Sequence, residues 1–231
     1  MTPRRPWQSL WEVVLCSGYP TQLALSGMAR LAGLTPQSPD GTLSLSFVAV
    51  VSAADTVVLV GLILWLLQRR GESPREVFLG HRHQGVEAGL GVILAPAVLF
   101  LIWFTLWLLQ AVAPALRTVP DNPFEAFAAS PGSAFVLLAL SVVAGGVREE
   151  IQRSFLLHRF RDDLGGAGWG LLATSLVFGL GHVLQGWDAV VVTALLGAAW
   201  GTVYLARGSI TASLVSHALA NAAQVVIAHL R

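Results

Sequence analysis

Two long runs of apolar residues place the strongest limit on how this chain can fold. Residues 45–68 and 86–113 are each longer than the roughly 20 apolar residues that a helix needs to cross a bilayer. Of the 231 residues, only 12% are charged, whereas a soluble domain carries about 25%. The mean hydropathy of +0.67 agrees with this composition. The sequence therefore predicts an all-α fold, a polytopic membrane helix bundle.

Further apolar segments set the number of spans. Four more clear candidates follow in the second half of the chain, at residues 134–157, 169–184, 189–206 and 210–230. The segment at residues 9–33 is weaker, because Glu12 and a Gly-Tyr-Pro break interrupt it. It fits either a first span or a helix lying in the membrane interface. Counting it gives about seven transmembrane helices.

The loops between these spans differ in charge. Most of the arginines lie in the termini or in loops 69–83, 158–168 and 207–209, whereas the other loops carry one arginine or none. Lys and Arg accumulate on the cytoplasmic side of membrane proteins. With Arg4 and Arg5 inside, every loop agrees with seven spans. We therefore expect an integral protein of a bacterial-type cell membrane with a cytoplasmic N-terminus.

Net charge and cysteine content exclude other classes. The formal net charge is +1, so the chain has no large basic surface, and we expect no nucleic-acid partner. The only cysteine, Cys16, excludes an internal disulfide and any CxxC site. The expected surroundings are the lipid bilayer and a membrane-embedded or lipidated substrate.

Several polar residues fall inside predicted spans, where a charge costs on the order of 2.5–3.5 kcal/mol. Each set has a structural explanation as well as a functional one. The acids after Arg148 fit a helix end at the interface, and the histidines and Asn221 fit interhelical hydrogen bonds. Asp55 is expected to be structural, paired with a basic residue of another span, or to help conduct protons. The three motif sets are Glu149–Glu150 with Arg153, Phe178 with His182, and His217 with Asn221.

Together these sets contain the groups that hydrolysis requires. A carboxylate and a histidine can hold and deprotonate a water. A histidine and an asparagine can donate hydrogen bonds to an oxyanion. Glu149, His182 and His217 could alternatively bind Zn²⁺ and leave one position for water. The residues alone leave both mechanisms open.

The ordered trio Glu-Glu, Phe-x-x-x-His and His-x-x-x-Asn resembles the CPBP family of intramembrane proteases, which includes the type II CAAX prenyl endopeptidases. The resemblance covers about residues 134–230. It implies that Glu149 is the general base and that His182 helps to position the water. It also implies an oxyanion hole formed by His217 and Asn221, with Glu150, Arg153 and Phe178 in support. Metal dependence stays open.

One departure concerns the first motif. The family usually has Glu-Glu-x-x-x-Arg, whereas here the arginine comes one residue early, at Arg153. Residues four apart share a helix face, so Arg153 is expected beside Glu149 rather than Glu150. That placement would allow the two acids to exchange roles. A second question is depth, because His182 is expected farther from the cytoplasmic side than Glu149 and His217.

The sequence thus predicts a single membrane domain over residues 1–231. Residues 1–133 would supply supporting helices, and residues 134–230 a catalytic four-helix region. The expected activity is an intramembrane endopeptidase that cleaves a membrane-associated or prenylated protein or peptide. The alternative is a non-catalytic transporter or scaffold that uses the same polar residues to bind a proton or a partner helix.

Overall fold

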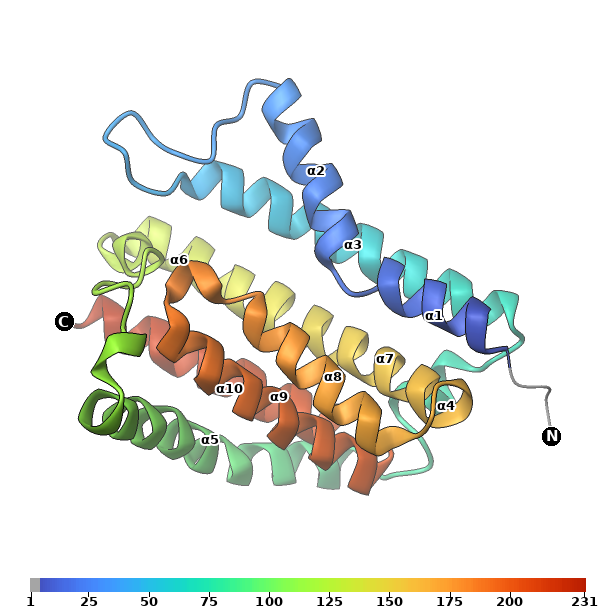
Figure 1. The fold of residues 1–231 in the computed structure, drawn as a ribbon. Coiled ribbons are helices and arrows are strands. Elements are labelled where there is room, and N and C mark those ends of the chain that lie inside the picture. Colours follow the sequence, from blue (N-terminus) through green and yellow to red (C-terminus); the bar gives the residue numbers. More distant parts are fainter. Residues whose placement is uncertain (1–4) are drawn as a thin grey trace.

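The computed structural model describes residues 5–231, so Arg4 of the charge argument lies outside the described residues. Within that range the chain forms helices and loops and no strand. The predicted all-α membrane bundle is confirmed. Figure 1 shows α1 (Pro6–Leu15), α2 (Tyr19–Leu31), α3 (Leu45–Arg69), α4 (Pro74–Phe78), α5 (Gln84–Val112), α6 (Pro131–Leu140), α7 (Glu149–Asp163), α8 (Ala167–Leu180), α9 (Trp187–Arg207) and α10 (Thr211–His229). Shorter turns are η1 (Pro114–Leu116), η2 (Glu125–Ala128) and η4 (Val183–Gln185), and a π-helix, η3 (Ser141–Arg148), joins α6 to α7.

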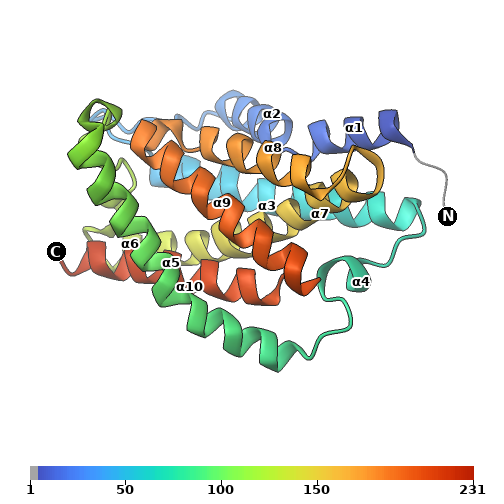
Figure 2. The same cartoon turned by 60° about the horizontal axis from the view of Figure 1, so that its bottom comes forward.

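Four helices, α3, α5, α9 and α10, are long and apolar enough to cross a membrane. The remaining predicted spans are either interrupted by charged residues or shorter. The segments α6, η3 and α7 follow one another directly and form one helical run, although charged residues interrupt its apolar character. Helix α8 is apolar but shorter. Figure 2 shows α5 crossing obliquely over α10. The predicted count of seven is therefore approximate.

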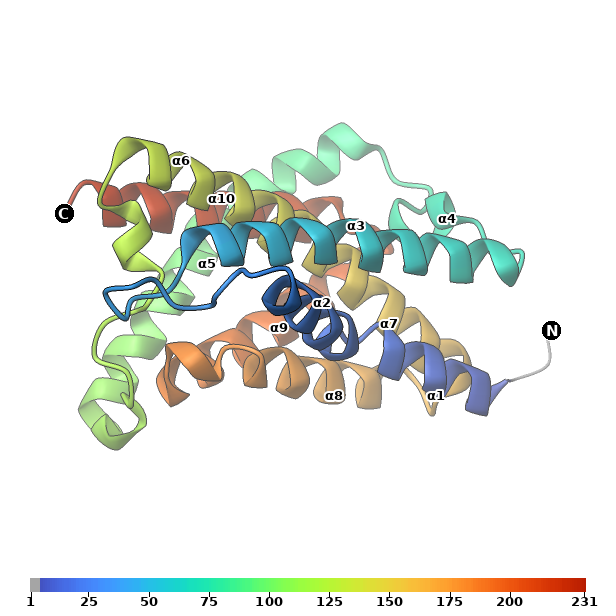
Figure 3. The ribbon, with the colours of Figure 1, turned by 90° about the horizontal axis from the view of Figure 1, so that it is seen from above.

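The weak segment at residues 9–33 is not a single straight span. It is divided into α1 and α2 by an elbow at Gly18, which has a φ of 89°, a conformation that favours glycine. Neither helix reaches the roughly 20 residues that a span needs. In Figures 1 and 3, α1 lies along one end of the bundle and α2 turns away from the direction of α3.

The basic loops meet at one end of the bundle, beside the start of α1 (right in Figure 1). Arg82 donates a hydrogen bond to the Arg207 carbonyl at 3.0 Å, and the Ile210 amide donates to the Phe78 carbonyl at 2.8 Å. The Arg70 guanidinium contacts Asp163 at 2.9 Å. The loops that were predicted to share one side of the membrane therefore lie together.

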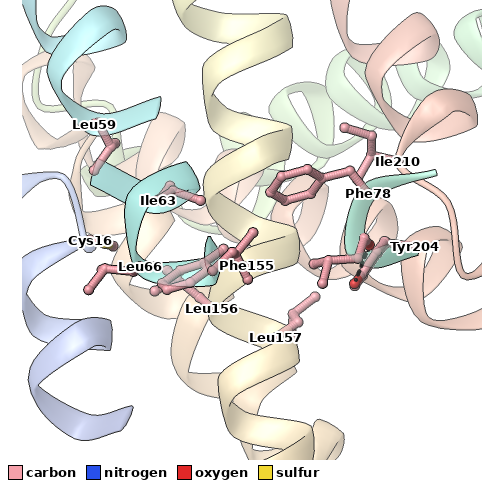
Figure 4. Close-up of a cluster of buried hydrophobic side chains, with 12 residues drawn as sticks. Cys16, Leu59, Ile63, Leu66, Phe78, Phe155, Leu156, Leu157, Tyr204 and Ile210 are labelled. Carbon is pink, nitrogen blue, oxygen red and sulfur yellow. Dashed lines mark hydrogen bonds between the residues drawn. The ribbon is translucent and has the colours of Figure 1, made fainter. Parts of the chain in front are cut away.

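A hydrophobic core fills this same end (Figure 4). Leu59, Ile63 and Leu67 of α3 pack with Phe155 and Leu157 of α7, and all five are fully buried. A second core joins α5, α9 and α10 nearer the middle and contains Val98, Ile102, Val192, Leu196, Trp200 and Ala220. These contacts hold α7, α9 and α10 in fixed positions, which the site requires.

The π-helix was not predicted, and it positions the first motif. Gly146 lies against Ala218 of α10, so closely that an added Cβ would be 3.0 Å from the Ala218 Cβ. The Asn221 side chain donates to the Ser141 carbonyl at 3.0 Å. A side chain that takes a backbone carbonyl in this way disturbs the regular helical ladder. π-Helical segments occur frequently at functional sites, and this one ends directly before Glu149.

Candidate active site

The two adjacent acids at the start of α7 have different surroundings. Glu150 is 1% exposed, and it accepts a hydrogen bond from Arg153 Nη1. Its Oε1 also lies 2.9 Å from His217 Nδ1. Glu149 instead lines both cavities of the bundle. Glu150 is thus held between Arg153 and His217 inside the protein, whereas the Glu149 side chain faces the cavities.

The expected pairing of Arg153 with Glu149 is wrong. Arg153 forms its ion pair with Glu150, three residues earlier on the same helix. Positions three apart are also neighbours on a helix surface, and the carbon stem of Arg is long enough to reach either acid. Glu149 is paired with Arg148 instead, at 3.2 Å. The early arginine therefore does not exchange the surroundings of the two acids.

His217 is held in a fixed orientation. Its ring stacks on Trp200 of α9, with centroids 3.7 Å apart and planes 15° apart. The Trp200 indole N–H donates to Ser216 Oγ at 3.1 Å. Since Nδ1 faces Glu150, the other ring nitrogen, Nε2, is left toward Glu149 Oε2, at 3.8 Å. That separation is too long for a direct hydrogen bond and short enough for one bridging water.

Trp200 was missed by the sequence reasoning. It is 2% exposed and also lies beside the Arg153 guanidinium, which is 5.5 Å from its ring. Phe178 contacts the same guanidinium at 4.5 Å. Arg153 is thus placed near two aromatic rings, a favourable arrangement for a buried cation. Nothing in the sequence singles out Trp200 as a site residue, since it is one of eight tryptophans in an apolar chain.

The sequence predicted that His182 lies inside an apolar helix, and the structure places it just after the end of one. Helix α8 ends at Leu180, and the His182 amide bonds to the Gly179 carbonyl at 2.9 Å in a tighter turn. His182 Nδ1 lies 3.0 Å from the Phe178 carbonyl oxygen. A carbonyl only accepts, so Nδ1 carries a proton in this contact and Nε2 is left for other partners. His182 and Glu149 nevertheless line the same two cavities.

All three motif sets meet at one cavity. A cavity of about 570 Å³ lies among α3, α5, α6, η3, α9 and α10, a size typical of ligand pockets. Its wall includes the motif residues Glu149, Phe178, His182, His217 and Asn221. Glu150 and Arg153 are not part of this wall. A second cavity of about 270 Å³, on the side of the α1–α2 elbow, shares Glu149, Phe178 and His182.

The three expected Zn²⁺ ligands, Glu149, His182 and His217, line the same cavity. Among residues 5–231, the side chains as placed do not form a group of three or more His, Cys, Asp or Glu around one metal position. Glu149 and His217 approach to 3.8 Å, and the Nδ1 atom of His182 is held by a backbone carbonyl, so its Nε2 is the nitrogen left for a water or a metal.

Asp55 has the structural partner that was expected. Its Oδ2 lies 3.0 Å from Arg148 Nη1, on another helix, and it is 1% exposed. Its Oδ1 accepts from Thr21 Oγ1 of α2 at 2.5 Å. The pairing with a basic residue of a different span is confirmed.

Comparison with known proteins agrees with the motifs. A family model described as type II CAAX prenyl endopeptidase Rce1-like matches residues 130–223. All seven motif residues lie inside the match, and residues 1–129 lie outside it. No curated protein and no solved structure matches the chain. The resemblance to the CPBP intramembrane proteases is therefore confirmed for the part of the chain that carries the motifs.

Proposed function

We propose, from the premise that residues 130–223 form an Rce1-like endopeptidase domain, that this chain hydrolyses a peptide bond of a membrane-associated or prenylated protein. One observation carries the proposal. Glu149 of α7, Phe178 of α8, His182 after α8, and His217 and Asn221 of α10 line one cavity of an apolar bundle. Polar groups at membrane depth are tolerated where they line a shielded cavity. Hydrolysis requires a carboxylate, imidazoles and a carboxamide close together, and these five residues supply them in one cavity.

Glu149 acts as the general base. Its Oε2 and His217 Nε2 are 3.8 Å apart, which leaves room for one water that contacts both. Glu149 takes a proton from this water as the oxygen attacks the scissile carbonyl, and it returns that proton to the leaving amine as the C–N bond breaks. His182, whose Nδ1 is held by the Phe178 carbonyl, presents Nε2 to position the water. A positioned acid or base contributes about 10²–10⁴-fold to a rate.

The oxyanion that forms on the carbonyl oxygen accepts hydrogen bonds from His217 and Asn221. The Asn221 amide uses one N–H on the Ser141 carbonyl and keeps the other for substrate. His217 donates from Nε2 in its imidazolium form, in which Nδ1–H stays on Glu150 and Nε2–H turns from the water to the oxyanion as the carbonyl is attacked. Losing one such donor costs about 10²–10³-fold in rate.

Glu150 orients His217 through Nδ1, as a buried carboxylate orients the histidine of a catalytic triad. Arg153 and Phe178 support this pair without touching the reacting atoms, because Arg153 binds Glu150 and stacks on Phe178. The assignment gives the two neighbouring acids different tasks, one chemical and one orienting.

The substrate side of the proposal follows from the cavity. Its walls carry apolar residues of α3, α5, α6, α9 and α10, including Ile102, Leu106, Leu140 and Leu196. Such walls suit an apolar segment or a lipid chain attached to the substrate. We place the basic-loop end of the bundle and the N-terminus in the cytoplasm of a bacterial-type cell, following the charge of the loops. In this division, residues 134–230 catalyse and residues 1–133 support them.

The test uses purified protein reconstituted in liposomes, with two probes: an internally quenched farnesylated CAAX-type peptide and a panel of single-span reporter proteins. Wild type should cleave at least one probe. The variants Glu149→Gln, Glu150→Gln, His182→Ala and His217→Ala should each lower the rate by at least about 10²-fold. Failure of wild type to cleave any probe would favour the transporter or scaffold alternative, and so would survival of cleavage in all four variants.

The chelator experiment separates the two kinds of hydrolase. The proposal routes no step through a metal, so incubation of wild type with EDTA or 1,10-phenanthroline should leave the rate unchanged. Loss of cleavage in chelator and recovery with Zn²⁺ would assign the water activation to a bound metal instead.

A further inference from the structure

Arg148 connects the proposed base to the part of the chain that lies outside the family match. Its Nη2 contacts Glu149 Oε1 at 3.2 Å, and its Nη1 contacts Asp55 Oδ2 at 3.0 Å. Two further hydrogen bonds fix the guanidinium: Nε donates to the Ala144 carbonyl at 3.3 Å, and Nη1 donates to Gln152 Oε1 at 3.3 Å. One guanidinium thus bridges two carboxylates on different helices.

Asp55 is itself held in place by the N-terminal helices. Thr21 Oγ1 donates to Oδ1 at 2.5 Å, and Gln22 Nε2 lies 3.4 Å from Oδ2. The elbow between α1 and α2 makes these contacts possible. A Cβ added at Gly18 would lie 3.0 Å from Gln152 Nε2 and 3.7 Å from Arg148 Nη1, so the backbone of the elbow lies directly against this network.

The charges of the network suit a base better than a simple ion pair would. Asp55, Arg148 and Glu149 together carry a net charge of about −1 when all three are ionised. Because Asp55 offsets much of the Arg148 charge, Glu149 can be oriented by Arg148 without being fully neutralised by it.

We propose that Asp55 and Arg148 are positioning residues that hold Glu149 toward the cavity, and that Thr21 and Gln22 hold Asp55. This inference rests on the proposed function. It makes α2 and α3 part of the catalytic machinery, although they lie outside residues 130–223. A misplacement of about 1 Å in a reacting group can cost on the order of 10²-fold in rate.

The chain offers a matched control for this inference. Glu87 is also 1% exposed, and it pairs with Arg207 at 2.5 Å at the basic-loop end, away from the two cavities. Asp55→Asn and Glu87→Gln therefore each remove one buried carboxylate from one ion pair. Only the first should affect the orientation of Glu149.

The experiment measures kcat and KM on the cleaved probe for wild type, Asp55→Asn, Asp55→Glu, Arg148→Gln, Glu87→Gln and Glu149→Gln. Rates are divided by the folded fraction of each preparation, taken from size-exclusion profiles. Asp55→Asn and Arg148→Gln should lower kcat by at least about tenfold with KM within about threefold, and Asp55→Glu should recover most of kcat. Glu87→Gln should keep the wild-type kcat per folded molecule.

Two outcomes separate the inference from the proposed function. If Asp55 were purely structural, Asp55→Asn would lower the folded fraction, while kcat per folded molecule stayed at the wild-type value. That result, with Glu149→Gln inactive, would overturn the inference alone. Full activity of Glu149→Gln would overturn the proposed function, and the inference with it.

Discussion

At the residue scale, the structure gives different surroundings to two neighbouring glutamates, Glu149 and Glu150. The motif order predicted residues that line one cavity, but the partner of Arg153 was predicted wrongly. Helical spacing permits contact at both three and four residues. His217, on another helix, is a second partner of Glu150 and so distinguishes its surroundings from those of Glu149. A contact of that kind depends on tertiary packing and cannot be read from spacing in one helix.

The two acids should therefore differ in stability as well as in activity. Glu150→Gln removes the anionic partner of buried Arg153, a change that costs about 3–5 kcal/mol in proteins. Glu149→Gln leaves Arg148 paired with Asp55 and should cost much less. Thermal unfolding in detergent, followed by tryptophan fluorescence, should show a clearly lower Tm for Glu150→Gln only. Equal Tm values for the two variants would contradict the different surroundings.

At the element scale, the ends and irregularities of helices were the least predictable features. The apolar runs predicted α3, α5, α9 and α10 well, because each is a long hydrophobic segment. The π-helix η3 and the early end of α8 were missed, since both depend on contacts with other elements. The Asn221 contact with the Ser141 carbonyl is an example, because its partners are far apart in the chain.

The close approach of η3 to α10 leads to a prediction at Gly146. In Gly146→Ala, the new Cβ would lie 3.0 Å from Ala218 Cβ and 3.1 Å from its Cα, so α10 must shift. Overpacking of this kind costs about 1–3 kcal/mol. We expect a lower Tm together with reduced cleavage, because α10 carries His217.

Gly132→Ala is the matched control, since a Cβ there meets nothing within 4 Å. Alanine is the better helix former by about 0.5–1 kcal/mol, so this variant should be as stable as wild type or slightly more stable. A Gly146→Ala variant with the same Tm and activity as the control would contradict the tight packing of η3 on α10.

At the scale of the whole molecule, loop charge predicted the arrangement well. The loops that were assigned to one side by their arginines meet at one end of the bundle. What charge could not predict is the division of residues 9–33 into two helices, which depends on the elbow at Gly18 and its contacts with Gln152.

Membrane orientation can be measured with single cysteines, because the native Cys16 is fully buried. Gln37 and His81 are both exposed; Gln37 lies in the loop before α3, and His81 lies between α4 and α5 in the basic loop that follows α3. In intact cells, a membrane-impermeant maleimide should label Gln37→Cys and leave His81→Cys unlabelled until the cells are opened. The reverse pattern would invert the proposed orientation.

Stability in acid should depend on the ion pairs at the basic-loop end. Burial alone would raise the pKa of Glu72, but hydrogen bonds from His158 and Arg159 outweigh it and lower this pKa below its ordinary value of 4.5. Its contribution to stability is therefore fully present above pH 4.5 and is lost as the pH falls through the lowered pKa. The Tm of wild type should fall in this window, and less so in Glu72→Gln. An equal fall in both would exclude Glu72 as a cause.

The most direct measurement of the central claim is the initial rate at which the Glu149→Gln variant cleaves the probe that wild type cleaves, per folded molecule in liposomes. The claim is that Glu149 activates the attacking water inside the cavity. It predicts a rate about 10²–10⁴-fold below that of wild type, with the folded fraction unchanged. A rate within about threefold of wild type would contradict it.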